Sequence, residues 1–401
     1  KMQCSSFLPS FLYLREFNMS RYLTPFVIQD LQKKMVFIGG PRQVGKTTLC
    51  RSLTATFPDL IYLNWDGEAH KSIIRKQQWL EAAPLVIFDE LHKYARWKQW
   101  IKGVYDLKPK HQQYLVTGSA RLDVYKRGGD SLLGRYHYWR LHPFTLDEIP
   151  DHIDKKDAYH RLLTLGGFPE PFLQNDEREA KRWRKERFHR ILREDVRDLE
   201  RVQELSLLDL MIDALRERVG GLITYANIAH DLHLSHHTVK KWLALSERMY
   251  MAFSVTPYTK KVCRAVQKAP KVYFYDNADC LADKAARLEN LVATHLLKRL
   301  QFREDYFGEQ CQLHYIRDRD GREVDFVTII DKKVIDLIEV KLSDEAPSTA
   351  LKYYRDKLTP QNTVQIVGEL TRSFDVNGIR VTNPIDYFQQ PPWEIATMLE
   401  S

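Results

Sequence analysis

A glycine-rich loop near the N-terminal end carries the first residues whose types and spacing could do chemistry. It fits the pattern G-x-x-x-x-G-K-[ST] without a gap. Loops of this pattern direct successive backbone N–H groups at phosphate oxygens, while the lysine reaches the β- and γ-phosphates and the hydroxyl after it ligates Mg²⁺. We therefore predict a site for ATP and Mg²⁺. The residues expected at the nucleotide are Gly40, Pro41, Arg42, Gln43, Val44, Gly45, Lys46, Thr47, Thr48 and Ser119.

The segments around the loop supply the strand and the helix that such a loop requires. The apolar residues 35–38 precede it directly and predict a buried strand, and residues 48–53 predict the helix. The alternative is a glycine-rich turn that binds no nucleotide. The preceding strand and a matching acidic strand downstream both argue against that alternative.

The matching strand comprises the apolar residues 85–88 and ends in Asp89 and Glu90. An aspartate at this place holds the Mg²⁺ shell in phosphate-loop enzymes, and an adjacent glutamate can polarise the attacking water. We therefore expect Asp89 at the metal and Glu90 at the water, with helix capping as the alternative. Another strand, 113–116, is followed by hydroxyl side chains, of which Ser119 is a candidate contact for the γ-phosphate and a simple turn residue in the alternative.

These pieces, in this order, resemble a family of bacterial and archaeal AAA-type ATPases with a nuclease-like C-terminal domain. The resemblance rests on residues 40–47, 88–93, Trp97, 117–119, and Leu-Leu-Gly-Arg at 132–135 leading to Leu-His-Pro-Phe at 141–144. It implies that Arg135 is the arginine that senses or stabilises the γ-phosphate, and that the protein is a homo-oligomer. A surface salt bridge is the alternative role for Arg135.

A second group of candidate residues lies in the C-terminal third. Strand alternation puts Glu339 and Lys341 on one face, and a hairpin can bring Asp325 opposite them. The expected order of helix, three antiparallel strands, helix and strand resembles the PD-(D/E)xK nuclease fold, in which a helix glutamate, here Glu289, completes the site. The resemblance implies metal at Glu289, Asp325 and Glu339, with Lys341 orienting the attacking water. The alternative is a scaffold that has lost cleavage.

The middle of the chain predicts helices rather than further sheet. Residues 181–190 are rich in cations, which we interpret as a solvated helix face rather than a track for a phosphate backbone. Residues 222–243 predict a winged helix-turn-helix, with Ser235 as the N-cap of its second helix. The exposed face of that helix would meet DNA or, as the alternative, protein. Its candidate contacts are His236, His237, Lys240 and Lys241.

Bulk properties limit the remaining choices. The 401 residues suffice for several domains, and the net charge of +8 permits a polyanionic partner such as DNA. The cysteines are scattered, so a reducing cytoplasm is expected, and no apolar run is long enough to span a membrane. The predicted divisions are a tail at 1–18, a phosphate-loop ATPase domain at 19–150, a helical lid at 151–204, the winged helix-turn-helix at 205–262 and an α/β nuclease-like domain at 263–401.

Strands and helices alternate through the ATPase domain, which predicts a parallel α/β sheet there. Two functions follow from this architecture. The first is Mg²⁺-dependent ATP hydrolysis coupled to DNA binding or processing, with cleavage by the C-terminal domain. The second is a switch in which ATP controls a DNA- or protein-binding surface and no strand is cut. The intact Glu90 favours turnover, and the intact set of Asp325, Glu339 and Lys341 favours cleavage.

Overall fold

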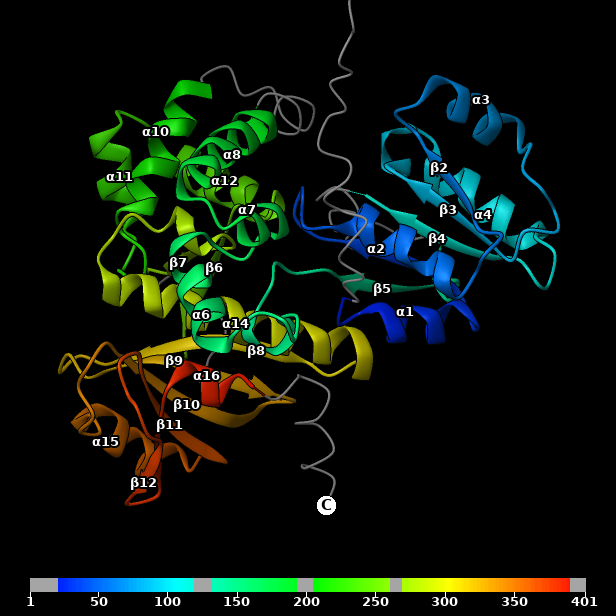
Figure 1. The fold of residues 1–401 in the computed structure, drawn as a ribbon. Coiled ribbons are helices and arrows are strands. Elements are labelled where there is room, and N and C mark those ends of the chain that lie inside the picture. The colour runs from blue at the N-terminus through cyan, green and yellow to red at the C-terminus, as the bar shows by residue number, and fades with distance from the viewer. Residues whose placement is uncertain (1–20, 119–131, 193–204, 260–268, 390–401) are drawn as a thin grey trace, which may run out of the picture.

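The computed structural model describes residues 21–118, 132–192, 205–259 and 269–389. Figure 1 shows two sheets on opposite sides of the molecule, with most of the helices above and between them. The predicted tail at 1–18 and the candidate Ser119 lie outside the described residues.

The first sheet is the predicted parallel one. Its strand order is β2-β3-β4-β1-β5, and every pair of neighbours is parallel. Because parallel strands point the same way, the segments after β1, β3 and β4 meet at one edge of the sheet. The strands are β1 (Met35–Gly39), β2 (Ile61–Asn64), β3 (Leu85–Asp89), β4 (Gln113–Thr117) and β5 (Tyr136–Arg140).

Both faces of this sheet are covered, and the alternation of side chains along β1 shows how. Val36 and Ile38 join one hydrophobic cluster, whereas Met35 and Phe37 join another on the opposite face. Burial on both faces explains why these strands are continuous apolar runs rather than alternating ones. The helices of this half are α1 (Thr24–Leu31), α2 (Lys46–Ser52), α3 (Glu68–Lys76) and α4 (Trp97–Leu107).

The middle of the chain is helical, as predicted. Ser235 caps α12 by accepting a hydrogen bond from the Thr238 backbone N–H, and Val239, Leu243 and Leu245 on the same helix are buried. These contacts fix how α12 packs and leave its polar face outward. The helices are α6 (Lys155–Thr164), α7 (Pro169–Gln174), α8 (Glu177–Arg190), α10 (Leu205–Arg216), α11 (Tyr225–Asp231) and α12 (His236–Arg248).

The second sheet has the order β12-β13-β11-β10-β9-β8-β6-β7. As predicted, β8, β9 and β10 pair antiparallel, and β11 then adds parallel to β10. The strands are β6 (Ala252–Pro257), β7 (Lys271–Phe274), β8 (Cys311–Arg317), β9 (Glu323–Ile330), β10 (Lys333–Lys341), β11 (Asn362–Val367), β12 (Phe374–Val376) and β13 (Ile379–Thr382). The helices are α14 (Lys284–Phe307), α15 (Thr349–Leu358) and α16 (Pro384–Tyr387).

The strand after α12 belongs to this second sheet. The predicted winged helix-turn-helix division, 205–262, contains β6, but β6 pairs antiparallel with β7 and parallel with β8. One hydrophobic cluster accordingly extends from Phe144 to Phe388, across the predicted divisions at 204 and 262. The helical segment and the C-terminal sheet therefore share one core.

Helix α14 connects the two halves of the molecule. Its 24 residues span about 36 Å at the usual rise of an α-helix. In Figure 1 it runs from the C-terminal half to a position beside β5, and the two elements are in contact. Within the described ranges, no helix combines the length and the apolar character that crossing a membrane requires.

Candidate nucleotide site and C-terminal carboxylate cluster

The loop after β1 has the backbone that its glycines predict. Gly40 has a φ of 138°, and a Cβ there would lie 2.3 Å from the carbonyl oxygen of Leu141. Gly45 has a φ of 96° at the start of α2. Side chains at these two places would clash or strain the backbone, so the loop needs glycine at both ends.

Lys46 folds back over this loop. Its Nζ donates to the carbonyl oxygens of Gly40 and Pro41, at 2.9 and 2.7 Å, and the residue is only 7% exposed. The loop carbonyls thus satisfy a buried ammonium group. These bonds hold the lysine at the mouth of the loop.

Thr47 and Asp89, the two residues predicted at the metal, are in contact. The Thr47 hydroxyl donates to Asp89 Oδ2 at 2.9 Å, across the edge between α2 and β3. A hydroxyl and a carboxylate are oxygen donors of the kind that Mg²⁺ takes, so these residues fit the expected metal. Two further hydroxyls, from Tyr62 and Thr117, also donate to Asp89. The sequence pattern did not predict them as partners of Asp89, because only the sheet order places their strands beside β3.

Glu90 lies next to this pair in an uncommon backbone conformation, with a φ of 56°. Its Oε2 lies 3.6 Å from His92 Nε2 and 3.5 Å from Lys93 Nζ. Among the described residues this oxygen has no hydrogen-bond partner. Burial raises the pKa of Glu90, and the charge of Lys46 acts against that rise. A partly buried carboxylate with a raised pKa is suited to accept a proton from water.

Arg135 does not lie beside the loop. Arg135 directly precedes β5, and the first residue of β5 pairs with Met35, the first residue of β1. The loop follows the last residue of β1, so it lies at the opposite edge of the sheet. The Arg135 guanidinium instead holds Asp106 at 2.7 Å on the surface. The salt bridge that we considered as the alternative is therefore present, and Arg135 cannot contact a nucleotide bound by its own chain.

The remaining predicted loop residues differ in exposure. Arg42 and Gln43 are partly buried, Val44 is fully buried and Thr48 is exposed. Gln43 has a φ of 63°, which contributes to the curvature of the loop. The loop therefore combines a buried base at Val44 with an accessible rim.

The C-terminal candidates converge around a residue that sequence analysis had not singled out. Lys271, at the start of β7, is 2% exposed. Its Nζ lies 3.1 Å from Glu289 Oε1 and 3.4 Å from Asp325 Oδ1. It also contacts Glu323, at 2.7 Å, which was not predicted either. Only the pairing of β6 with both β7 and β8 brings this lysine to the cluster.

The other two candidates are arranged as strand alternation predicted. Lys341 Nζ lies 2.6 Å from Glu339 Oε1, so the two side chains share a face of β10. Asp325 Oδ2 accepts the Val340 backbone N–H at 2.9 Å, which ties β9 to β10 beside them. The Tyr273 hydroxyl donates to Glu289 at 2.6 Å. The helix glutamate and the strand residues therefore form one buried network.

The network is crowded with negative charge. Burial, with the charge of Asp325, raises the pKa of Glu289 to about 7 and that of Glu339 to about 7. Burial alone would lower the pKa of Lys271, but the charges of Glu289, Asp325 and Glu323 raise it. Lys271 therefore stays charged and serves as the internal counterion of the cluster.

These residues do not fit the divalent metal that the nuclease resemblance implies. In the part of the chain that the structure describes, no group of three or more His, Cys, Asp or Glu side chains could hold a metal ion. Lys271 is a separate obstacle, because its ammonium group contacts both Glu289 and Asp325. A divalent cation and a buried ammonium would compete for the same oxygens and repel each other.

Comparison with known proteins finds a described family for the segment that carries the first of these two sites. Residues 32–150 match the family model described as "AAA domain". Two models described as "Domain of unknown function" match residues 156–290 (DUF8612) and 284–384 (DUF4143). The match at 156–290 crosses from α6 into α14, in keeping with the core that these segments share.

The curated relatives and the solved structure described next share less than a quarter of their aligned residues with this chain. An uncharacterized protein of Mycobacterium tuberculosis is 23% identical over 60% of this chain, which spans about half, 54%, of its length. An uncharacterized protein of Haemophilus influenzae is 24% identical over 88% of this chain and 94% of its own length. An uncharacterized protein of Methanocaldococcus jannaschii is 23% identical over 82% of this chain and 79% of its own length. The solved structure of a Walker-type ATPase of Pyrococcus abyssi superposes with a TM-score of 0.41 and 15% sequence identity. The superposition covers 65% of this chain and 95% of the ATPase chain. From the family match, this chain contains a P-loop ATPase-like domain of the AAA type.

Proposed function

We propose that the protein hydrolyses ATP in a Mg²⁺-dependent reaction at the loop of residues 40–47. The contact between Thr47 and Asp89 carries this proposal, because it joins the end of the loop to the end of β3. Lys46 lies at the same loop and Glu90 directly follows Asp89. A phosphate cradle, a metal-ligand pair and a carboxylate base are thus close together.

Each residue has a distinct task in this proposal. Lys46 exchanges its bonds to the loop carbonyls for bonds to phosphate oxygens, and Thr47 and Asp89 hold Mg²⁺. Bound Mg²⁺ would supply neutralisation of the charge on the phosphates. Glu90 orients the attacking water and accepts its proton, which a raised pKa favours near neutral pH.

Replacing Glu90 with Gln separates binding from turnover. We expect Glu90→Gln to bind ATP with little change in affinity but to release phosphate about a hundredfold more slowly, because the amide cannot accept the proton. The matched control is Glu68→Gln, an exposed acid on α3 that pairs with Lys71. Phosphate release at saturating ATP, with the affinity for ATP measured separately, tests this. Wild-type turnover in Glu90→Gln would remove Glu90 from the reaction.

We further propose that hydrolysis is coupled to DNA binding or processing by the rest of the chain. Support comes from the outward face of α12, where His236, His237, Lys240 and Lys241 are exposed. Histidine and lysine on one helix face suit a phosphate backbone or base edges. A homo-oligomer belongs to the same proposal, since Arg135 could reach a nucleotide only in a neighbouring copy.

A second candidate function is favoured by Lys271. In it the C-terminal domain is a non-cleaving scaffold, and ATP controls a surface that binds DNA or protein. The buried ammonium group neutralises the carboxylates that a nuclease would offer to metal ions. Because a tethered cation is always present, the cluster is stable without any metal.

A cleavage assay decides between these two functions. Linear and circular DNA would be incubated with the wild-type protein and Mg²⁺ or Mn²⁺, beside the Lys341→Ala variant. The scaffold predicts no loss of intact DNA in either sample. Metal-dependent cleavage by the wild type that disappears in Lys341→Ala would instead establish the nuclease and give Lys341 its catalytic role.

A further inference from the structure

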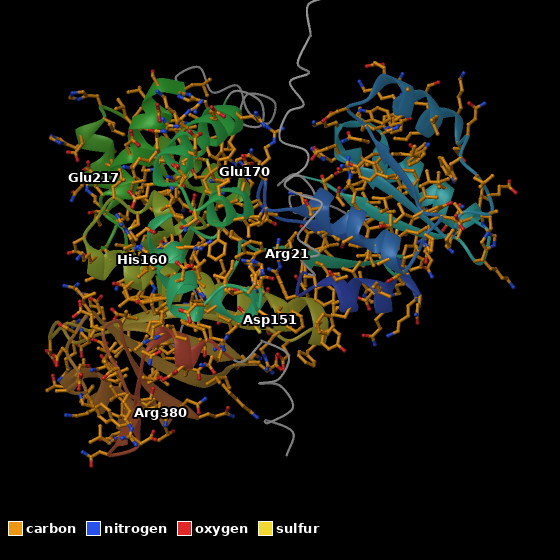
Figure 2. All side chains as sticks on the ribbon, in the orientation of Figure 1. Arg21, Asp151, His160, Glu170, Glu217 and Arg380 are labelled. Carbon is orange, nitrogen blue, oxygen red and sulfur yellow. The ribbon has the colours of Figure 1, made fainter. Side chains whose placement is uncertain are left out.

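An arginine outside the phosphate-loop pattern holds the base of the loop. Arg21, just before α1, is 5% exposed, and Figure 2 shows it between the two halves of the molecule. Its Nη1 donates to the Val44 carbonyl oxygen at 2.7 Å, and its Nη2 donates to the His142 carbonyl oxygen at 2.5 Å. One guanidinium group therefore joins the loop to the segment that follows β5.

The bond to Val44 orients the peptide group that follows it. A trans peptide is planar, so its C=O and N–H point in opposite directions. While Arg21 holds the Val44 carbonyl, the N–H of Gly45 must point away from Arg21. Gly45 cannot be replaced without crowding this contact, because a Cβ there would lie 3.3 Å from Arg21 Nη1. In loops of this pattern the backbone N–H groups are the ligands of the phosphates.

The same guanidinium is tied to α14 through buried charges. Arg21 Nη2 lies 2.8 Å from Glu148 Oε1, and the other oxygen of Glu148 lies 3.7 Å from Lys298 Nζ. Lys298 is on α14, is 1% exposed, and also pairs with Asp147 at 3.1 Å. Two cations and two anions thus form a neutral, buried cluster. Because separating any one of these charges from its partners leaves a buried charge unpaired, movement of one member is energetically coupled to the others.

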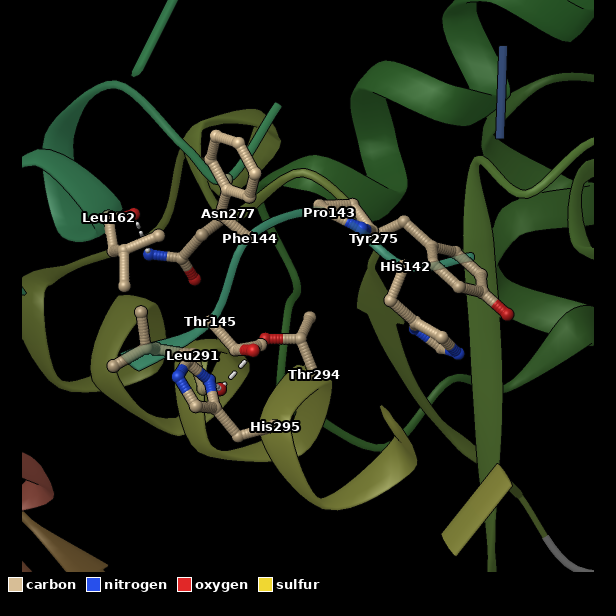
Figure 3. Close-up of a pocket in the computed structure, with 11 residues that line it drawn as sticks. His142, Pro143, Phe144, Thr145, Leu162, Tyr275, Asn277, Leu291, Thr294 and His295 are labelled. Atoms are coloured by element: carbon tan, nitrogen blue, oxygen red, sulfur yellow. Dashed lines mark hydrogen bonds between the residues drawn. The ribbon is translucent and has the colours of Figure 1, made fainter. Parts of the chain in front are cut away.

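The surrounding junction leaves little room for independent movement. Figure 3 shows the small cavity between residues 142–145 and α14, whose volume of about 10 Å³ holds about one water molecule. His295 of α14 accepts the Leu146 backbone N–H at 3.0 Å, beside the cluster. Burial lowers the pKa of His295 to about 3, so it is neutral and can accept this bond at physiological pH. The segment that bears Asp147 and Glu148 is therefore also held to α14 by a hydrogen bond from its backbone to the His295 side chain.

We propose that Arg21 is a positioning residue for the nucleotide loop and that Glu148 and Lys298 couple this loop to α14. The proposal rests on ATP binding at residues 40–47. Phosphates that engage the Gly45 N–H favour one orientation of the Val44 peptide, and Arg21 transmits that preference to the cluster. Helix α14 carries Glu289 nearer its other end, so nucleotide state and the C-terminal domain become linked through one helix.

Arg21→Gln tests the positioning role against a matched variant of the same junction. Arg140 also joins the ATPase half to α14, at 2.6 Å from Glu304 and 2.8 Å from Asp305, but its side chain contacts no loop carbonyl. We expect Arg21→Gln to weaken ADP binding about tenfold or more, measured by titration calorimetry. Arg140→Gln should change the affinity less than about twofold while lowering the melting temperature. Equal ADP affinities for Arg21→Gln and the wild type would overturn the positioning role.

Lys298→Met tests the coupling from the α14 side without touching the loop. We expect ADP affinity to fall in this variant as well, because Glu148 loses one partner and binds Arg21 differently. Hydrogen exchange of α14, measured with and without ADP, should show nucleotide-dependent protection in the wild type that Lys298→Met loses. Protection that persists unchanged in Lys298→Met would overturn the coupling. Should the wild type itself bind no ADP, the proposed function fails, which is distinct from either result.

Discussion

Lys46→Ala is expected to abolish ATP binding and to reduce phosphate release at least about a hundredfold. The ammonium group is the only cation that the pattern itself places at the phosphates, and it is already held at the mouth of the loop by Gly40 and Pro41. Alanine leaves two buried carbonyls without this donor and the phosphates without this charge. Binding of a fluorescent ATP analogue and phosphate release at several ATP concentrations measure the two effects separately.

The control for this prediction is a lysine elsewhere in the same domain. Lys71 on α3 forms a salt bridge with the exposed Glu68, so Lys71→Ala should retain wild-type binding and turnover. A circular dichroism spectrum and a melting curve for Lys46→Ala guard against simple unfolding. If the folded variant still hydrolysed ATP at the wild-type rate, the assignment of the loop would be wrong.

Lys271→Met is expected to destabilise the C-terminal half by about 3 kcal/mol at pH 8, because buried carboxylates lose their counterion. Methionine preserves most of the volume, so the loss reports charge rather than packing. Glu289, Glu323 and Asp325 are the groups left uncompensated. Urea unfolding followed by tryptophan fluorescence measures the change in the free energy of unfolding.

The loss of stability in Lys271→Met should become smaller as the pH falls. The direction of this pH dependence follows from the pKa of Glu289. Its pKa is raised in the folded protein from an ordinary value of 4.5 to about 7. Between these values the folded state holds a proton that the unfolded state has lost, so this group contributes stability that falls as the pH rises through the window. Without Lys271 the folded pKa rises further. The variant should therefore be closest to the wild type near pH 5 and furthest from it at pH 8.

A second substitution separates this effect from a general loss of positive charge. Lys240 is exposed on α12, and Lys240→Met should change the free energy of unfolding by less than about 0.5 kcal/mol at either pH. A penalty for Lys271→Met that was the same at pH 5 and pH 8 would contradict the role of Lys271 as a counterion.

Much of the nucleotide site could be predicted because its residues are close in sequence to the strands that place them. Thr47 and Asp89 each follow or end a buried strand, and parallel strands deliver their carboxyl ends to one edge. The contact between them was therefore expected from pattern alone. Arg135 was placed by resemblance instead, and the strand register put it at the opposite edge from the loop.

The C-terminal candidates also include one pair that the sequence pattern predicted and one residue that it did not. Alternation along β10 predicted correctly that Glu339 and Lys341 share a face, because the side-chain period of a strand is two. No local pattern marks Lys271, which reaches Glu289 and Asp325 only through the pairing of β6 with β7 and β8. Strand pairing between distant segments depends on the whole core, and a single sequence does not report it.

By itself, then, the sequence determined the phosphate loop, its acidic partner strand, the parallel sheet and the alternation of the C-terminal hairpins. All of these depend on local spacing and on the periods of helix and strand. Tertiary structure alone decided that Lys271 occupies the carboxylate cluster and that Arg21 connects the loop to α14. Both are buried charges whose partners lie far away in the chain, and only the fold brings such partners close enough to compensate the cost of burial.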